Sequence, residues 1–158
     1  MFGQLGVESL VIFIGINDIG TRLDAKKNGA AYASAADIVE GLRHLADQAR
    51  QRGLKVIGAT ITPYAGAGFY WSEDGEADRQ TVNAWIRTGK CFDAVIDFDA
   101  VLRDPQAPDR LAVPFDSGDH LHPSMAGHAQ MARAVDLSFS VPNQLSALQR
   151  PFTVPAAP

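Results

Sequence analysis

Three short apolar runs, separated by stretches of helical periodicity, constrain the fold of this chain more than any other feature. The runs are rich in branched side chains and do not alternate with polar residues, which is typical of strands buried on both faces of a parallel sheet. They lie at residues 9–16, 54–61 and 92–98. Apolar residues recur at helical spacing in residues 35–52, 76–88 and 124–137. This alternation predicts an α/β fold with a parallel sheet and right-handed crossovers.

Residues that favour the start or the end of a helix stand at the ends of the helical stretches. Ser34 followed by Asp37 has the pattern of a capping box, and Gly53 stands where a helix commonly ends. Ser124 is a suitable N-cap for the last helix. Residues 63–75 and 104–119 are rich in glycine, proline and polar side chains, and we expect them to form loops.

A chain of 158 residues is long enough for one domain. We expect the α/β domain to occupy residues 1–137. Residues 138–158 contain four prolines and show no sustained periodicity, so an irregular, proline-rich tail is expected there.

Charge and hydropathy argue against nucleic-acid binding and against a membrane span. The chain has 14 Lys and Arg against 18 Asp and Glu, and it has no basic run, so we expect no nucleic-acid binding. The longest apolar run, residues 9–16, is much shorter than the ~20 residues that span a membrane, so no membrane span is expected. The single cysteine, Cys91, cannot form an internal disulfide.

In parallel sheets, ligands bind beyond the carboxyl ends of the strands. Asn17 follows the first apolar run, where its amide can serve as a hydrogen-bond donor to an oxyanion. An alternative is that Asn17 and Asp18 are simply favourable loop residues. The glycines around them lack the spacing of a dinucleotide-binding fingerprint.

A second polar group stands before the last helix. Asp119 precedes His122 by three residues, so its carboxylate can accept the Nδ1 proton and leave Nε2 free as a general base. The spacing favours His122 over His120, which lies too near Asp119 to face it easily. Two alternatives remain open: the group caps the helix or lies in solvent, or it binds a metal. The metal ligands would then be Asp119, His120, His122 and His128.

These two segments resemble two sequence blocks of the SGNH (GDSL) hydrolases, a family of serine esterases and lipases. Gly15, Asn17 and Asp18 match its Gly-x-Asn-Asp block, and Asp119, His122 and Pro123 match its Asp-x-x-His-Pro block. The flanking segments 53–63, 79–87, 92–99 and 118–132 resemble one bacterial branch of the family. The resemblance covers about residues 6–137.

The resemblance implies a three-layer αβα fold with a flavodoxin-like parallel sheet and hydrolysis of carboxylic esters through an acyl-enzyme. Asn17 would be the oxyanion donor, His122 the general base and Asp119 its orienting carboxylate. Gly15 and Asp18 would support the loop. No cofactor or metal is implied, and the substrate class would be a small acyl ester or an acetylated carbohydrate. The aromatic residues of the loop after the second strand either line a pocket for aryl or sugar esters or only pack the loop: Tyr64, Phe69, Tyr70 and Trp71.

The chain departs from the family at the nucleophile, because residues 1–14 contain no Gly-Asp-Ser sequence. No serine present has a better role than turn or cap, and Cys91 lies at the wrong end of its strand. We therefore expect the carboxyl-terminal part of a longer hydrolase that lacks the first strand–helix unit. The strand at residues 9–16 would then be an exposed apolar edge, prone to self-association. A non-catalytic ligand-binding or interaction module is the alternative, and a metal-assisted hydrolase is a further one.

Overall fold

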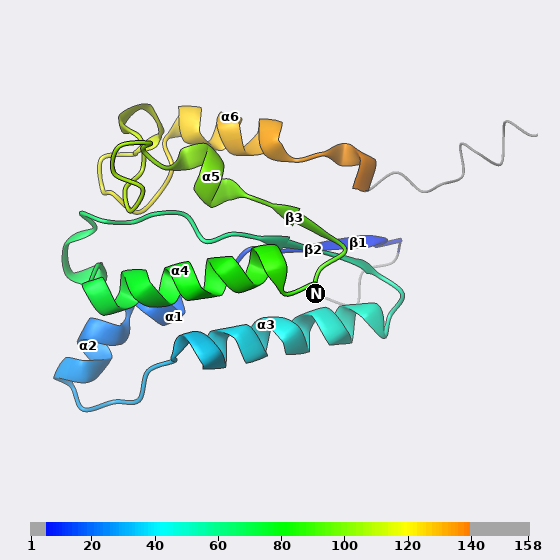
Figure 1. The fold of residues 1–158 in the computed structure, drawn as a ribbon, viewed down its shortest axis with the longest axis horizontal. Helices are drawn as coiled ribbons and strands as arrows, with labels where there is room; N and C mark the ends of the chain where they lie inside the picture. Colours follow the sequence, from blue (N-terminus) through cyan, green and yellow to red (C-terminus); the bar gives the residue numbers. More distant parts are fainter. Residues whose placement is uncertain (1–5, 140–158) are drawn as a thin grey trace, which may run out of the picture.

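Three parallel strands form the middle layer of the structure, a computed structural model that describes residues 6–139 (Figure 1). β1 (Ser9–Ile12), β2 (Lys55–Ala59) and β3 (Ala94–Ile96) lie in the order β1-β2-β3. Figure 1 shows α3 and α4 on one face of the sheet and α5 and α6 on the other. The α/β class, the parallel sheet and the three-layer architecture predicted from the sequence are therefore confirmed.

Among residues 6–139, three long helices lie in the periodic stretches but differ from them at their ends, and three short helices lie outside these stretches. Their bounds are α1 (Ile16–Gly20), α2 (Arg22–Lys27), α3 (Ala35–Arg50), α4 (Glu73–Thr88), α5 (Phe98–Leu102) and α6 (Met125–Ala134). Short 3-10 turns occur at η1 (Gly68–Tyr70), η2 (Val113–Phe115) and η3 (Leu137–Phe139). α4 begins three residues earlier than predicted because the Ser72 hydroxyl accepts a hydrogen bond from the Gly75 amide and caps the helix.

All three predicted strands are longer than the observed ones, and two of them run into the helix that follows. The apolar run at residues 9–16 leaves the sheet after Ile12, and Gly15, at φ 118°, turns the chain into α1. A side chain at this position would place its Cβ 2.8 Å from Ile61, so glycine suits the site in both space and backbone conformation. In the third run, Asp97 accepts a hydrogen bond from the Ala100 amide, so Phe98 begins α5 instead of ending β3.

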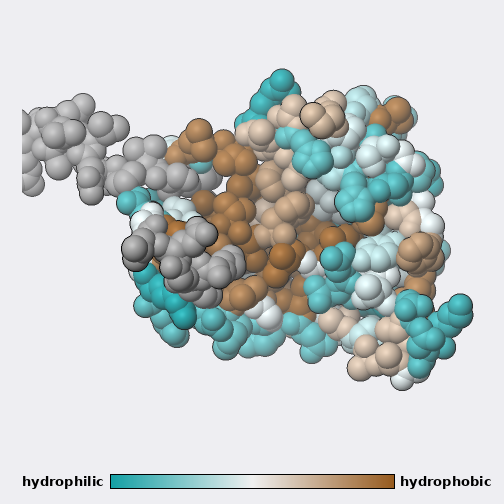
Figure 2. Space-filling view, turned by 180° about the vertical axis from the view of Figure 1, so that it is seen from behind, coloured by the Kyte–Doolittle hydropathy of each residue, from teal (hydrophilic) through white to brown (hydrophobic). Residues whose placement is uncertain are grey.

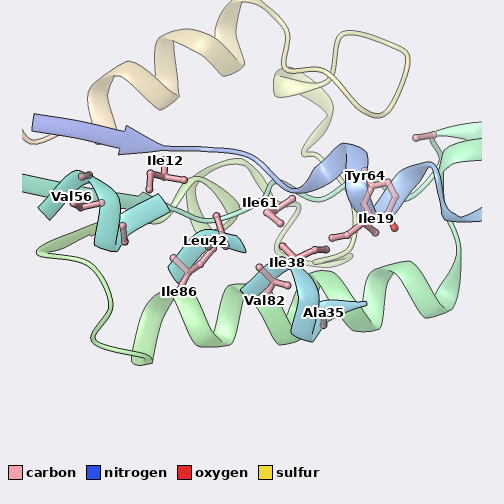
Figure 3. Close-up of a cluster of buried hydrophobic side chains, with 13 residues drawn as sticks. Ile12, Ile19, Ala35, Ile38, Leu42, Val56, Ile61, Tyr64, Val82 and Ile86 are labelled. Carbon is pink, nitrogen blue, oxygen red and sulfur yellow. The ribbon is translucent and has the colours of Figure 1, made fainter. Parts of the chain in front are cut away.

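The main hydrophobic core lies between the sheet and the pair α3 and α4 (Figure 3). Ile38 and Leu42 of α3 meet Val82 and Ile86 of α4 beneath Val56 of β2. A second cluster on the opposite face joins Ile57, Ala59, Ile96 and Phe98 to residues at the end of α6. Both faces of β2 are therefore covered, as its uninterrupted apolar sequence predicts.

A buried polar network ties α4 to the loop that follows β2. Arg79 is fully buried, and its guanidinium donates to Asp99 Oδ1 at 2.6 Å and to the Ile61 carbonyl at 2.9 Å. Asn83 bonds both the amide and the carbonyl of Ile61, at 2.7 and 2.8 Å. These contacts satisfy the backbone where β2 ends, and they fix the start of the segment that forms one wall of the site described below.

One face of β1 is not covered. Val11 lies opposite Ile57 in the sheet register, yet Val11 is 44% exposed and Ile57 is 3% exposed. Phe13 and Val7 nearby are also exposed. Figure 2 shows apolar side chains gathered across the middle of the face seen from behind. Strand β1 thus forms an edge of the sheet that the structure describes, and its α6-side face is open.

Two further expectations concern a membrane span and the irregular tail. Within residues 6–139, no helix has both the length and the hydropathy needed to cross a bilayer. The predicted irregular tail, residues 138–158, lies outside the described residues except for Ser138 and Phe139, which belong to η3.

Candidate active site

The loops at the carboxyl ends of β1 and β2 and the segment before α6 meet at the same end of the molecule (Figure 1). There they surround an open cavity of about 430 Å³. Its lining residues are Asn17, Ala67, Gly68, Phe69, Tyr70, Asp119, Leu121 and His122. The structure thus brings together the three residues that the sequence singled out for chemistry, although more than 100 positions separate Asn17 from His122.

Asp119 and His122 form a hydrogen-bonded pair, with 2.6 Å between Asp119 Oδ2 and His122 Nδ1. The other carboxylate oxygen accepts bonds from the amides of His122 and Leu121, at 2.8 and 2.9 Å, and from the Ser117 hydroxyl at 2.8 Å. The backbone and side-chain bonds from His122 and the bonds from Leu121 and Ser117 hold the pKa of the Asp119 carboxyl far below its usual range.

The low pKa of Asp119 decides the tautomer of His122. An ionised carboxylate only accepts hydrogen bonds, so the proton between the two groups belongs to Nδ1 of the imidazole. In the neutral ring, Nε2 then carries a free lone pair. Both side chains are open to solvent in the described part of the chain, with 70% of His122 and 51% of Asp119 exposed.

Asn17 lies in the first turn of α1, where Gly15 begins the helix. Its Oδ1 accepts a hydrogen bond of 2.7 Å from the Tyr70 hydroxyl. No group among residues 6–139 accepts a hydrogen bond from Asn17 Nδ2. The amide therefore has a free donor at the cavity that His122 also lines. Gly15 and Asp18 lie beside a neighbouring cavity, along α3.

A second Asp–His pair, which the sequence analysis missed, lies next to the first. His120 Nδ1 is 2.5 Å from Asp116 Oδ2, and Asp116 Oδ1 accepts bonds from the amides of Gly118 and His120. Partial burial by itself raises the pKa of the Asp116 carboxyl, but these hydrogen bonds outweigh it and the pKa is lowered. His120 reaches Asp116 because its backbone adopts a φ of 62°, and its ring then packs against Gly66.

The four residues considered as metal ligands do not form a cluster. His120 and His122 are bound to different aspartates, and His128 Nδ1 lies 3.0 Å from the Ser124 carbonyl. In the part of the chain that the structure describes, no three His, Cys, Asp or Glu side chains are arranged to hold a metal ion.

No serine among residues 6–139 is hydrogen-bonded to the His122 side chain. Ser34, Ser72 and Ser124 cap helices, and the Ser117 hydroxyl donates to Asp119. Ser9 begins β1, at the opposite end of the strand from the cavity. Cys91 also precedes its strand, β3, and its carbonyl accepts a bond from Arg50. Residues 6–139 therefore supply no nucleophile that is already hydrogen-bonded to His122.

The fold defines a three-layer α/β protein with a parallel sheet and a cavity beyond the carboxyl ends of β1 and β2. The sequence model of the GDSL-like lipase/acylhydrolase family matches residues 3–130. The chain belongs to this family.

Solved structures have the same fold. A GDSL-like lipase from Bacteroides thetaiotaomicron is similar with a TM-score of 0.67 and 19% identity, over 84% of this chain and 62% of that one. A putative acylhydrolase from Bacteroides fragilis is similar with a TM-score of 0.60 and 20% identity, over 82% of this chain and 60% of that one. The chain thus spans less than two thirds of the length of these neighbours. No curated protein matches the chain.

Proposed function

We propose that this chain supplies the asparagine, aspartate and histidine of a site that hydrolyses carboxylic esters, and that the nucleophilic serine comes from a segment outside residues 6–139. One observation carries the proposal. His122, held through Nδ1 by an ionised carboxylate, lines the same cavity as an asparagine amide that has a free donor. Acyl transfer through a serine needs, besides the serine itself, a base that takes its proton and a donor that stabilises the oxyanion. Both lie at this cavity.

In the proposed reaction, His122 Nε2 takes the proton of the serine hydroxyl while the serine oxygen attacks the ester carbonyl. The oxyanion that forms accepts a hydrogen bond from Asn17 Nδ2, a contribution of about 3–4 kcal/mol to the transition state. The His122 imidazolium then protonates the departing alkoxide, and the alcohol leaves the acyl-enzyme. Water, deprotonated by the same nitrogen, attacks the acyl group, and the imidazolium returns this proton to the serine oxygen as the acid leaves.

The exposure of the Asp119–His122 pair supports a contribution from another segment. Water competes for the hydrogen bonds of an exposed Asp–His pair and screens the carboxylate charge. Strand β1 leads directly into α1, the helix that carries Asn17. A parallel strand added at the edge of β1 would end near Gly15, two positions before Asn17, which lines the cavity. The alternative covering of this edge is a second copy of the chain, which is the self-association expected from the sequence.

The cavity suits a small acyl ester or an acetylated carbohydrate. Its volume of about 430 Å³ is within the range of ligand pockets. Phe69, which is 83% exposed, and Tyr70 form its aromatic wall. Aromatic faces of this kind pack against sugar rings and aryl groups.

The test is hydrolysis of p-nitrophenyl acetate by the 158-residue chain. We expect a slow rate above that of buffer, because the base and the oxyanion donor retain part of their effect on attack by water. His122→Ala and Asn17→Ala are each expected to reduce this rate at least tenfold. His44→Ala and His128→Ala remove histidines that lie outside the cavity and control for unspecific imidazole catalysis. Equal rates in His122→Ala and His128→Ala would contradict the proposal.

A non-catalytic binding module remains the second candidate, favoured by the lack of a serine bonded to His122 within residues 6–139. Acetate binding followed by NMR of the chain distinguishes the two functions. Saturable shifts at Asn17 and His122, with no His122-dependent hydrolysis, would establish the binding module.

A further inference from the structure

Tyr70 connects the aromatic wall of the cavity to Asn17. Its hydroxyl donates to Asn17 Oδ1 at 2.7 Å, across 53 positions of sequence. Within residues 6–139 this is the only hydrogen bond that either side chain makes. The contact therefore acts on one end of the amide only.

The orientation of an asparagine amide matters at an oxyanion site. The two ends of the amide have nearly the same shape, but the NH2 end donates and the oxygen end only accepts. The terminal torsion of asparagine is broad and roughly two-fold, so an unrestrained amide samples both orientations. An amide with its oxygen toward the developing oxyanion would repel the charge instead of stabilising it.

We propose that Tyr70 is a positioning residue that binds the oxygen end of the Asn17 amide and thereby holds its NH2 group free for the oxyanion. This inference rests on the proposed ester hydrolysis for its chemical purpose, but the orientation itself does not depend on it. A phenol hydroxyl is a stronger donor than acceptor because its lone pairs are shared with the ring. Burial, and in second place the charge of Asp18, raise the pKa of the Tyr70 hydroxyl, so it keeps its proton at neutral pH.

The surrounding fold keeps the Tyr70 ring in place. A Cβ at Gly20 of α1 would lie 2.0 Å from the ring, so the tyrosine occupies space that only glycine leaves open. The Tyr70 amide bonds the Ala67 carbonyl at 2.9 Å, and the Ala65 amide bonds the Asp109 carbonyl at 2.8 Å. The hydroxyl is thus placed by α1 on one side and by the loop after β2 on the other.

The first test is NMR of the side-chain NH2 group of Asn17 in the 15N-labelled chain. Tyr70→Phe removes the hydroxyl and keeps the ring, so the fold and the melting temperature should be retained. We expect the Asn17 NH2 signals to shift and broaden in Tyr70→Phe as the amide begins to rotate. The control is Tyr32→Phe, which changes a tyrosine that contacts Arg22 and Lys26 outside the cavity. Unchanged Asn17 NH2 signals in Tyr70→Phe would overturn the inference.

The second test is the kinetics of p-nitrophenyl acetate hydrolysis. Tyr70→Phe is expected to lower the His122-dependent kcat about tenfold, with KM changed less than twofold, because the amide acts on the transition state. In a pH–rate profile, the kcat of the wild type should fall in alkaline solution as Tyr70 ionises. The profile of Tyr70→Phe should lack this alkaline fall. If the wild type hydrolyses the ester in a His122-dependent way and Tyr70→Phe has the same kcat, the inference is overturned. If the wild type shows no such hydrolysis, the proposed function fails, and the NMR result alone decides whether Tyr70 orients Asn17.

Discussion

At the scale of residues, the segment 116–122 contains two Asp–His pairs built from the same kind of backbone contacts. In both, one carboxylate oxygen binds backbone amides and the other binds the Nδ1 atom of the histidine. They differ in surroundings, because the Asp119–His122 pair lies at the Asn17 cavity and the Asp116–His120 pair lies against Gly66. The proposed acyl chemistry concerns the first pair, and we expect a structural role for the second.

The structural role of Asp116 has a consequence for stability in acid. Its pKa is lower in the folded chain than in the unfolded chain, where it is about 3.9. The ionised carboxylate therefore contributes stability that is present above about pH 4 and is lost as the pH falls through the lower, folded-state pKa. We expect Asp116→Asn to have a smaller free energy of unfolding than the wild type at pH 7. The difference should shrink below pH 4.

Urea unfolding at a series of pH values measures this effect. Asp104→Asn, which changes an aspartate outside both Asp–His pairs, is the matched control. An Asp116→Asn deficit that stays constant from pH 7 to pH 2 would show that the carboxylate charge is not its source.

Site residues could be predicted from the sequence where their spacing or their place after a strand indicated a role. Asp119 and His122 could be predicted because they lie three positions apart on one turn, and Asn17 because it follows an apolar strand. The Asp116–His120 pair depends on the positive φ of His120, which composition and periodicity do not report. The Tyr70–Asn17 contact depends on the packing of α1 against the loop after β2, which only the folded chain reveals.

Among the secondary-structure elements, local signals predicted the starts of α3 and α6 more closely than the start of α4 or the ends of the strands. The predicted capping box of α3 is present: the Asp37 amide donates to Ser34 Oγ at 3.2 Å, and the Ser34 amide donates to Asp37 Oδ2 at 2.9 Å. The short helices α1, α2 and α5 were missed, because five or six residues are too few to show a period.

The cap of α3 provides a test at this scale. Ser34→Ala leaves an amide of the first turn without a partner, so we expect a loss of about 1 kcal/mol in the free energy of unfolding. Ser34→Thr keeps a capping hydroxyl and should recover most of the loss. Chemical denaturation of the three proteins measures both effects, and a wild-type stability for Ser34→Ala would refute the cap.

In the whole molecule, the described helices cover one face of the sheet fully and the other face only in part. The face of the sheet toward α3 and α4 is covered by a continuous core, whereas α5 and α6 cover the other face over β2 and β3 and leave β1 open. The sequence predicted the order of the layers, because buried strands and amphipathic helices alternate. It also indicated an apolar edge at the first strand.

The open face of β1 predicts self-association of the 158-residue chain. Exposed apolar side chains and unpaired backbone groups at a sheet edge favour pairing with another copy. Val11→Lys places a charge on this face at a position that is already 44% exposed, so the fold should tolerate it. We expect it to weaken dimerisation at least tenfold in sedimentation equilibrium. Val113→Lys changes a valine that is 85% exposed, away from β1, and should leave the association unchanged. A monomeric wild type at high concentration would contradict the prediction.

The proposed ester hydrolysis requires that Asp119 hold His122 with a proton on Nδ1 and a free Nε2 at the Asn17 cavity. The imidazole nitrogen shifts of His122 in the 15N-labelled chain, recorded in alkaline solution where the ring is neutral, test it most directly. We expect a protonated Nδ1 and a bare Nε2 in the wild type. In Asp119→Ala, Nε2 should become the favoured protonation site, as in free imidazole, while His120 keeps its tautomer through Asp116. A wild-type His122 with its proton on Nε2, or one whose tautomer is unaffected by Asp119→Ala, would contradict the account.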